Sequence, residues 1–536
     1  MMLARQCSAR SSLALLAALL LSIVLLTARR LHGGYPVGWP QLPDRLKSQH
    51  AGADEEGPQQ GPETEAWSTP AGGSQGQGGI GSASPNFCGR DWEFLRSEAL
   101  GLTKNIVYTR RCVKPVHGDV DRNAVGNVEE PLIASTTSLD LGADCSRVAP
   151  PPCEPLALEV PPAFPEPRGQ YGHLLFAVAS TYERVRESLP VFAHWLADTG
   201  AQLLAVIADA DDPVLKPDLG ALEAQYRDRR INATVVSPRF KESLPRKNTK
   251  DEKAKRPAAV EQLHFLMIRD MLELSTPQTR WLGVLDDDTF FPALHPLSVA
   301  LGEHDHTRPA WLGALADNWI SMKIWGFMAY GGAGIFLSVP LARELDPHLE
   351  ACVRETTVPS GDGMLRDCVY GRTTTKLTVV DGLHQNDIRG DAAGFFESGR
   401  RVLSIHHWKS WYRAPVAPMA AVARVCGDCF LQRWRFGADT LLANGYSVSV
   451  YRDGVGALDL RRMERTFDEA DGRFDFSYGP FRPRLPGDRK KSYRLEAVDG
   501  GSARGEKLRQ LYVHRANREQ AGAQAADEVV ELVWDM

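Results

Sequence analysis

The sequence predicts an α/β fold: a mostly parallel sheet with helices on both faces, followed by a β-rich C-terminal extension. Two apolar runs, HLLFAVAST and AQLLAVIADADD, flank the amphipathic helical segment ERVRESLPVFAHWLADTG. A strand, a helix and a strand in this order place two parallel strands in one sheet. A third apolar run, WLGVL, ends abruptly in three aspartates, as a buried strand does when it reaches the edge of a sheet.

Length and composition indicate a globular protein with more than one folded part. The chain has 536 residues, which exceeds a single ordinary core. It is 43% hydrophobic and 24% charged, with a formal net charge of -5. This balance gives no bias toward nucleic acid, so a nucleic-acid-binding protein is not indicated.

The N-terminal region predicts a tethered protein. Residues 11–28 contain no charge and are bracketed by arginines, which favours an uncleaved signal-anchor transmembrane helix over a cleaved signal peptide. Residues 1–10 would then be a cytosolic tail. Residues 29–85 are rich in Gly, Gln, Glu, Pro and Ser, so we expect a flexible lumenal stem. The prediction is a single-pass type II membrane protein.

Cysteines support a lumenal location for the folded body. Nine cysteines are present, and setting Cys7 aside leaves an even number, as disulfides require. Residues 86–167 carry four of them among prolines, so we expect a disulfide-stapled, irregular subdomain there. Cys352 and Cys368 are a candidate pair. The CGDC segment at 426–429 could be half of a zinc site, a redox pair or, as we favour, part of disulfide bonding.

A potential glycosylation site agrees with this compartment. Asn232 opens an Asn-Ala-Thr triplet, the acceptor pattern for N-glycosylation. Such triplets also arise by chance.

The three aspartates after WLGVL are the first candidate for chemistry. On a strand, Asp286 and Asp288 share one face and Asp287 points the other way. Two carboxylates about 6 Å apart repel by roughly 3 kcal/mol at an effective dielectric near 20. A divalent cation relieves that repulsion, and oxygen ligands suit Mg²⁺ or Mn²⁺. An acidic turn or helix cap is the simpler alternative, but the preceding apolar run favours a site.

Other strand ends and loops supply further candidates. Asp209 and Asp211 follow the second strand, where a nucleotide would lie in an open α/β sheet. Residues 239–256 form a basic stretch that is either a lid over a diphosphate or a solvated loop. The segment EQLHFLMIRDMLEL predicts one helix with His264 in or beside the core, and Trp319, Met322 and Trp325 are expected in a loop.

Three later segments carry residues that suit a catalytic site. YGGAGIFLS lets backbone amides approach a ligand or forms a plain tight turn, through Gly331, Gly332, Ala333 and Gly334. Asp362, in SGDGMLRDC, stands near a helix start as either an N-cap or an exposed general base. VLSIHHWKSW predicts a strand that ends in His406 and His407, either of which could complete a metal shell.

Taken together and in order, these segments resemble the Fringe-like family of β-1,3-glycosyltransferases, most closely its fungal, membrane-anchored branch of the secretory pathway. WLGVLDDDTFF looks like the family's strand and DxD motif, YGGAGIFLS like its acceptor-side loop, SGDGMLRDC like its acidic segment and SIHHW like its terminal histidine. The resemblance covers residues 171–411. It implies a nucleotide-sugar-binding, GT-A-like fold of Rossmann type over 168–414 and a Golgi membrane location.

The resemblance also implies a role for each motif. Asp288 would bind Mn²⁺ or Mg²⁺ directly, with His406 or His407 closing the metal shell. Asp362 would be the catalytic base. The remaining residues would contact the nucleotide sugar, namely Asp286, Asp287, Ala179, Ser180, Thr181, Asp209 and Asp211. The sequence departs from the family at Gly361, where relatives carry a further acid.

The function predicted is transfer of a sugar from a UDP-sugar to a hydroxyl of a glycan or glycoprotein, with inversion and a β-1,3 linkage. A single base and a metal-bound leaving group suffice for that reaction. The alternatives are a non-catalytic glycan-binding or chaperone-like relative and a metal-dependent sugar hydrolase. Residues 415–536 contain alternating, β-branched and aromatic runs, which predict the β-rich extension.

Overall fold

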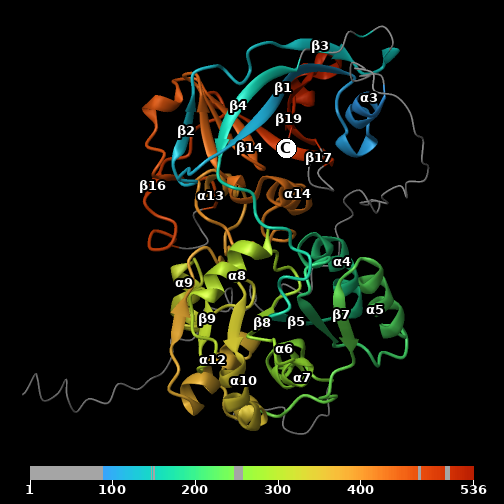
Figure 1. Cartoon of the computed structure of the whole chain (residues 1–536), viewed down its shortest axis with the longest axis vertical. Helices are drawn as coiled ribbons and strands as arrows, with labels where there is room; N and C mark the ends of the chain where they lie inside the picture. The colour runs from blue at the N-terminus through green and yellow to red at the C-terminus, as the bar shows by residue number, and fades with distance from the viewer. Residues whose placement is uncertain are drawn as a thin grey trace, which may run out of the picture. The chain divides into compact units, whose positions relative to one another are not determined.

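The computed structural model describes residues 89–145, 148, 151, 153–246, 257–468, 473–500 and 507–535 (Figure 1). The chain divides into two units, Met1–Ser82 and Ala83–Met536, and all described residues belong to the second. The predicted tail, signal anchor and stem lie outside the described residues. Within the described part, no helix is long and apolar enough to cross a membrane.

A seven-stranded sheet forms the part of the structure that carries the predicted motifs (Figure 1). Its strand order is β11-β9-β10-β8-β5-β6-β7. The four strands β8, β5, β6 and β7 run parallel, and β10 is antiparallel to both of its neighbours. The strands are β5 (Leu174–Ser180), β6 (Gln202–Ile207), β7 (Asn232–Val236), β8 (Trp281–Leu285), β9 (Trp311–Gly313), β10 (Ile335–Ser338) and β11 (Leu377–Val379).

Helices cover both faces of this sheet, as predicted, because successive side chains of each strand point to opposite sides. Along β5, Phe176 and Val178 enter one hydrophobic core, and Leu175 and Ala177 enter the other. The helices α4 (Tyr182–Leu196), α5 (Leu219–Asp228) and α8 (Leu294–Gly302) pack on the first face. The other face carries α6 (Val260–Leu266), α7 (Ile268–Leu274), α10 (Val339–Leu345), α11 (Leu349–Glu355) and α12 (Gly361–Arg372).

A ten-stranded sheet joins the beginning and the end of the described chain. Its order is β2-β12-β13-β14-β17-β18-β19-β1-β3, with β4 also paired to β1. The early strands are β1 (Asn105–His117), β2 (Val125–Val128), β3 (Thr137–Asp140) and β4 (Glu154–Val160). The late strands are β12 (Arg433–Phe436), β13 (Thr440–Ala443), β14 (Ser447–Tyr451), β17 (Lys490–Gly500), β18 (Leu508–His514) and β19 (Asp527–Trp534). The β-rich C-terminal extension is therefore confirmed.

This sheet corrects the expectation of an irregular subdomain at residues 86–167. β1 runs parallel to β19, with Ile106 opposite Asp527. This partner of β1 lies 421 positions later, beyond the reach of any local sequence pattern. The segment is an integral part of the sheet built by the C-terminal extension.

Several local predictions also differ from the structure. The segment EQLHFLMIRDMLEL forms two short helices, α6 and α7, instead of one. Residues expected in a loop form α9 (Trp319–Trp325), because the Asn318 side chain accepts hydrogen bonds from the first-turn amides of Ile320 and Ser321. The strand expected before His406 is reduced to an isolated bridge between Phe290 and Ile405. The remaining elements are α3 (Arg90–Leu95), α13 (Ala393–Phe396), α14 (Val416–Cys426), α15 (Arg518–Ala521), β15 (Met463–Glu464) and β16 (Phe481–Arg482).

Disulfides occur in both sheet regions. The predicted Cys352–Cys368 bond is confirmed and links α11 to α12. Cys426 and Cys429 form a local disulfide, which excludes the zinc-site reading of that segment. A further bond joins Cys112 in β1 to Cys153.

Candidate functional site

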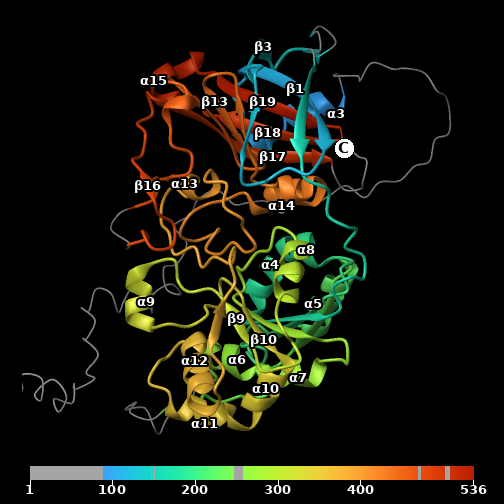
Figure 2. The same ribbon diagram turned by 60° about the vertical axis from the view of Figure 1, so that its left-hand side comes forward.

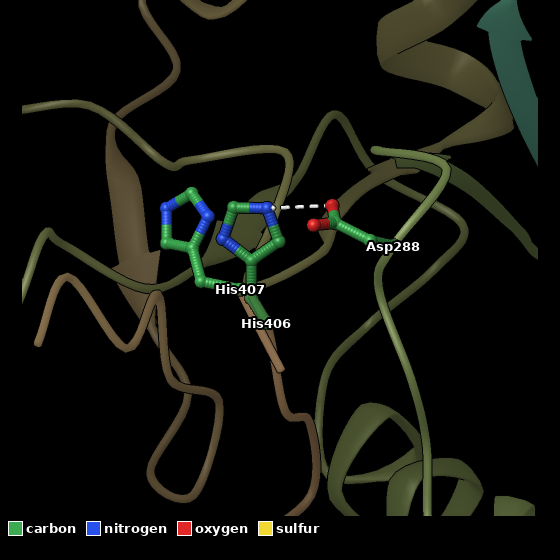
Figure 3. Close-up of side chains that lie close together, drawn as sticks. All are labelled: Asp288, His406 and His407. Carbon is green, nitrogen blue, oxygen red and sulfur yellow. Dashed lines mark ion pairs between the residues drawn. The ribbon is translucent and has the colours of Figure 1, made fainter. Parts of the chain in front are cut away.

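Two carboxylates and an imidazole meet at the carboxyl end of β8. His406 Nε2 lies 3.0 Å from Asp288 Oδ1 and 3.3 Å from Asp286 Oδ2. Asp286 and Asp288 thus face the same partner, as predicted, although both lie in the segment that follows β8 and not on the strand itself. Figure 3 shows the His406 ring between Asp288 and the ring of His407. The structure therefore brings together three of the residues that the sequence nominated.

The orientation of His406 is set by the backbone around it. The bridge between Ile405 and Phe290 ties its segment to the chain that follows the aspartates. His406 Nδ1 lies 3.0 Å from the carbonyl oxygen of Gln385, so Nδ1 carries the proton that it donates there. Nε2 is consequently the nitrogen presented to the carboxylates. A hydrogen bond to a backbone carbonyl is also how a metal-binding imidazole is commonly oriented.

His407 lies on the far side of His406 from Asp288. Its φ of 57° is left-handed, which few non-glycine residues adopt. The ring stacks on Trp411 with centroids 4.0 Å apart, and its Nε2 is 3.5 Å from Asp387 Oδ1. One ligand atom from each of Asp288, His406 and His407 lies within 4.8 Å of the others. Both histidines are near enough to bind a metal, but His406 is the one that contacts Asp286 and Asp288 directly.

Charges in the cluster influence one another strongly. Burial disfavours ionisation of Asp288, but the adjacent His406 outweighs burial and lowers the pKa of this carboxyl. Burial likewise opposes a charge on His406, and the Asp288 and Asp286 carboxylates raise its pKa well above the usual value. Burial and the neighbouring His406 lower the pKa of His407. In the described arrangement His406 and Asp288 form an ion pair.

The Asp287 side chain, in the turn after β8, has different partners from those of Asp286 and Asp288. Arg184 of α4 binds its carboxylate through two nitrogens, at 2.6 and 2.7 Å, and Ser180 Oγ donates a third hydrogen bond. Ser188 Oγ also donates to the Asp287 carbonyl, at 2.8 Å. These contacts tie the end of β8 to β5 and α4. A donor-binding role for Asp287 stays a prediction, since its carboxylate already has protein partners.

Asp362 stands in the first turn of α12, where the sequence placed it. Ser360, and not Asp362, caps the helix by accepting from Gly363 N. The two oxygens of Asp362 are instead used across the site: Oδ2 accepts from Gly331 N at 3.0 Å, and Oδ1 lies 3.1 Å from His264 Nε2. An aspartate with these partners is held in position but does not serve as the cap.

His264 is the residue that sequence reasoning missed. Its helical spacing indicated a core residue, and the ring is indeed buried. Its Nδ1, however, lies 3.8 Å from Asp286 Oδ1, so the ring bridges Asp286 and Asp362. The only sequence signal is that a titratable residue interrupts an apolar helix face. Burial disfavours its charge, but Asp362 and Asp286 raise the pKa of His264.

The glycine segment forms a tight turn packed directly on these side chains. A Cβ added to Gly332 would overlap the ring of His406, and one added to Gly331 would lie 2.7 Å from Asp286 Oδ1. Gly334 has a left-handed φ of 96° and donates to the Gly331 carbonyl at 2.9 Å. Ala333 N donates to Gln385 Oε1 at 3.0 Å. The turn thus allows the histidine and the carboxylates to approach one another.

The other nominated residues lie apart from this cluster. Asp209 Oδ1 accepts from Tyr182 N at 2.7 Å, at the start of α4, and Asp211 pairs with Lys241 at 2.6 Å. Ala179 and Ser180 end β5, and Thr181 is the N-cap residue of α4. Asn232 is exposed at the start of the edge strand β7, so its glycosylation stays a prediction.

The donor set fits a divalent metal ion. Asp288 and Asp286 offer carboxylate oxygens, and His406 offers Nε2 once its proton is displaced. Mixed oxygen and imidazole ligands suit Mn²⁺ better than Ca²⁺, and carboxylates alone suit Mg²⁺. His407 offers a further ring nitrogen within 4.8 Å of the ligand atoms of Asp288 and His406. We therefore identify this cluster as a candidate metal centre.

Comparisons with known proteins give distant similarities. A solved structure of mouse xyloside xylosyltransferase 1 is 11% identical, with 39% of this chain and 84% of that chain covered and a TM-score of 0.25. A mannosyltransferase from Pyrobaculum calidifontis, solved with GDP-Man and Mn²⁺, is 13% identical, with 44% and 64% covered and a TM-score of 0.24. The galactosyltransferase LgtC, solved with donor and acceptor sugar analogs, is 12% identical, with 48% and 92% covered and a TM-score of 0.27.

One protein family matches part of the sequence. It is described as "Protein of unknown function, DUF604", and it matches residues 322–426. That segment includes the glycine turn, Asp362 and both histidines of the candidate site. Among curated proteins no match was found.

Proposed function

We propose that this protein is a metal-dependent, inverting glycosyltransferase that moves a sugar from a UDP-sugar to a hydroxyl of a glycan or glycoprotein. One observation carries the proposal. Asp286, Asp288 and His406 converge at the carboxyl end of the parallel strand β8. The ring of His264 connects Asp286 to Asp362. Open α/β sheets bind their ligands at that edge. The ordered motifs that resemble Fringe-like enzymes support the UDP-sugar donor and the β-1,3 linkage.

The donor side of the site would be built by Asp288, Asp286 and His406. Bound there, Mn²⁺ or Mg²⁺ supplies Lewis-acid stabilisation of the charge that develops on the departing diphosphate. The surrounding residues hold these metal-binding side chains in position. Gln385 orients His406 from behind, and Trp408 Nε1 donates to the Asp288 carbonyl at 2.8 Å, which fixes the backbone that presents the carboxylate.

The acceptor side would use Asp362 as the general base. This carboxylate would take the proton of the attacking hydroxyl while the new glycosidic bond forms and the bond to the diphosphate breaks. Attack from the face opposite the leaving group inverts the anomeric centre in one step. His264 and Gly331 N hold the two Asp362 oxygens in place, so the base is oriented before the acceptor arrives.

The secretory pathway is the proposed compartment. The bonds Cys112–Cys153 and Cys352–Cys368 each join separate elements, and such disulfides persist in oxidising compartments. A Golgi location and membrane attachment through residues 11–28 belong to the same proposal. Fluorescence microscopy of the full chain with a Golgi marker tests it, and a cytosolic signal would contradict it.

Calorimetric titration with UDP, with and without Mn²⁺, separates the two halves of the site. We expect Asp288→Ala to abolish Mn²⁺-dependent UDP binding. Asp362→Ala should bind UDP as the wild type does and lose transfer by about 10²–10⁴-fold. Asp305→Asn, an exposed carboxylate outside the cluster, is the matched control and should change neither property.

Three results would contradict the proposal. Equal loss of UDP binding in Asp288→Ala and Asp362→Ala would remove the distinction between metal ligand and base. Absence of UDP binding by the wild type, with and without the metal, would favour a non-catalytic glycan-binding protein. Release of free sugar at the same rate with and without acceptors would instead indicate a hydrolase.

A further inference from the structure

The segment between β9 and β10 leaves the candidate site and returns to it. Near its start, Asp317 accepts from Asn386 N at 2.8 Å, and the side-chain oxygen of Asn386 accepts from His406 N at 3.3 Å. At its end, Gly331 N donates to Asp362. The residues in between, which include α9, are therefore anchored at one end to the His406 backbone through Asn386 and at the other end to the Asp362 side chain.

This segment is also held along its length. Trp319 N donates to the Arg473 carbonyl at 3.0 Å, and Ser477 Oγ donates to the Asp317 carbonyl at 2.6 Å. Arg366, one helical turn after Asp362 on α12, donates to the carbonyl of Trp325. Figure 2 shows α9 at the outer side of this region, near α12. The conformation is thus specified by contacts to the catalytic helix and to the C-terminal extension.

Large aromatic side chains on this held segment face solvent. Trp319 is 42% exposed and Phe327 is 62% exposed. Phe476, from the C-terminal extension, is 50% exposed and meets Trp319 edge to face with ring centroids 6.1 Å apart. Among the large apolar side chains exposed in the described residues, the one aromatic elsewhere is Tyr370. We call Trp319, Phe327 and Phe476 the aromatic platform.

The size of the platform indicates what covers it. Side chains of this kind bury roughly 150–250 Å² when fully covered, so the exposed fractions leave about 300 Å². A stable protein interface needs about 800 Å² on each partner, made by 20–30 residues. A short oligosaccharide, whose rings offer apolar C–H faces of about one aromatic ring each, needs no more surface than the platform supplies.

We propose that the aromatic platform is the acceptor subsite of this enzyme and that its occupant is an oligosaccharide. This inference rests on the proposed function, because the segment that carries Trp319 and Phe327 leads to Gly331, whose amide donates to the proposed base Asp362. Sugar rings would stack on Trp319 and Phe476, and Phe327, which follows the Arg366 contact, would face the ring nearest the base. The C-terminal extension thereby contributes to acceptor recognition through Phe476.

The test is calorimetric titration of the full chain with maltotriose, cellotriose, chitotriose and mannotriose, each in the presence of Mn²⁺ and UDP. We expect at least one trisaccharide to bind the wild type. Trp319→Ala and Phe476→Ala should weaken that binding at least tenfold, and Trp319→Phe should restore most of it. Tyr370→Ala, which removes an aromatic ring of similar exposure, 41%, should stay within twofold of the wild type.

The outcomes separate this inference from the proposed function. Unchanged Mn²⁺-dependent UDP binding in all variants shows that they are folded. Trisaccharide binding that survives Trp319→Ala and Phe476→Ala overturns the platform. Absence of binding by the wild type for every trisaccharide also overturns it. In both cases Mn²⁺-dependent UDP binding would still support the proposed transferase. Trisaccharide binding by a wild type that fails to bind UDP keeps the platform as a glycan-binding surface and overturns the transferase.

Discussion

A single methyl group on Gly332 tests whether the position of His406 controls metal binding. The backbone of Gly332 has no left-handed φ, so alanine is conformationally allowed there. The added Cβ would nevertheless overlap three atoms of the His406 ring. The ring is only 3% exposed and its Nδ1 is held by Gln385, so it cannot move aside without breaking that hydrogen bond.

The expected magnitude follows from these contacts. Overpacking a filled site costs about 1–3 kcal/mol, and loss of one hydrogen bond adds about 1 kcal/mol. We therefore expect Gly332→Ala to lower the free energy of unfolding by about 2–4 kcal/mol. Displacing an oriented imidazole should weaken Mn²⁺ binding by about 10–100-fold, the range seen when the support of a metal ligand is removed.

Urea denaturation and Mn²⁺ titration in the presence of UDP measure the two effects. The control is Gly371→Ala in α12, where an added Cβ meets no atom within 4 Å. That variant should gain about 0.5–1 kcal/mol, because alanine favours a helix over glycine. Wild-type metal affinity in a destabilised Gly332→Ala protein would refute the link between the position of the His406 ring and the metal. An unchanged free energy of unfolding in Gly332→Ala would refute the close packing of Gly332 on the His406 ring.

Two further predictions concern stability. Replacing Cys352 and Cys368, 16 positions apart, by serine should lower the free energy of unfolding by about 3 kcal/mol, measured in urea; a loss under about 1 kcal/mol would contradict this. Burial opposes ionisation of Glu397, but Lys490 and Arg494, at 2.6 and 2.8 Å, lower its pKa from 4.5 to about 2. A carboxyl with a depressed pKa stabilises the fold above the unfolded pKa and loses that contribution as pH falls toward the folded one. The wild type should therefore lose more stability than Glu397→Gln between about pH 5 and about pH 2.5. Urea midpoints that fall by the same amount in both proteins over this pH range would contradict this.

Strands that are buried on both faces were predictable from the sequence. The run WLGVL coincides with β8, and the fold class followed from the order of strands and helices around it. The sequence also predicted that Asp286 and Asp288 share one partner and that Asp287 has another, which is Arg184, although all three residues follow the end of β8. These features depend on local patterns, and local patterns are what a sequence shows directly.

Long-range contacts were not predictable in this way. His264 has the spacing of a core residue, and only the tertiary structure places its ring between Asp286 and Asp362. α9 was expected to be a loop, although Asn318 caps it and Trp319 and Met322 stand at the helical spacing of three residues. Which of the two histidines meets the aspartates depends on a left-handed φ at His407 that no motif encodes.

The pairing of β1 with β19 has a consequence for how the protein is made. A ribosome releases β1 long before it completes β19, so the nascent chain carries a long, unpaired strand edge while most of the protein is synthesised. Exposed edges of this kind recruit other strands and aggregate. Truncation after β18 would leave that edge permanently open, so nonsense mutations between the codons of β18 and β19 should cause retention by chaperones even though every residue of the candidate site is present.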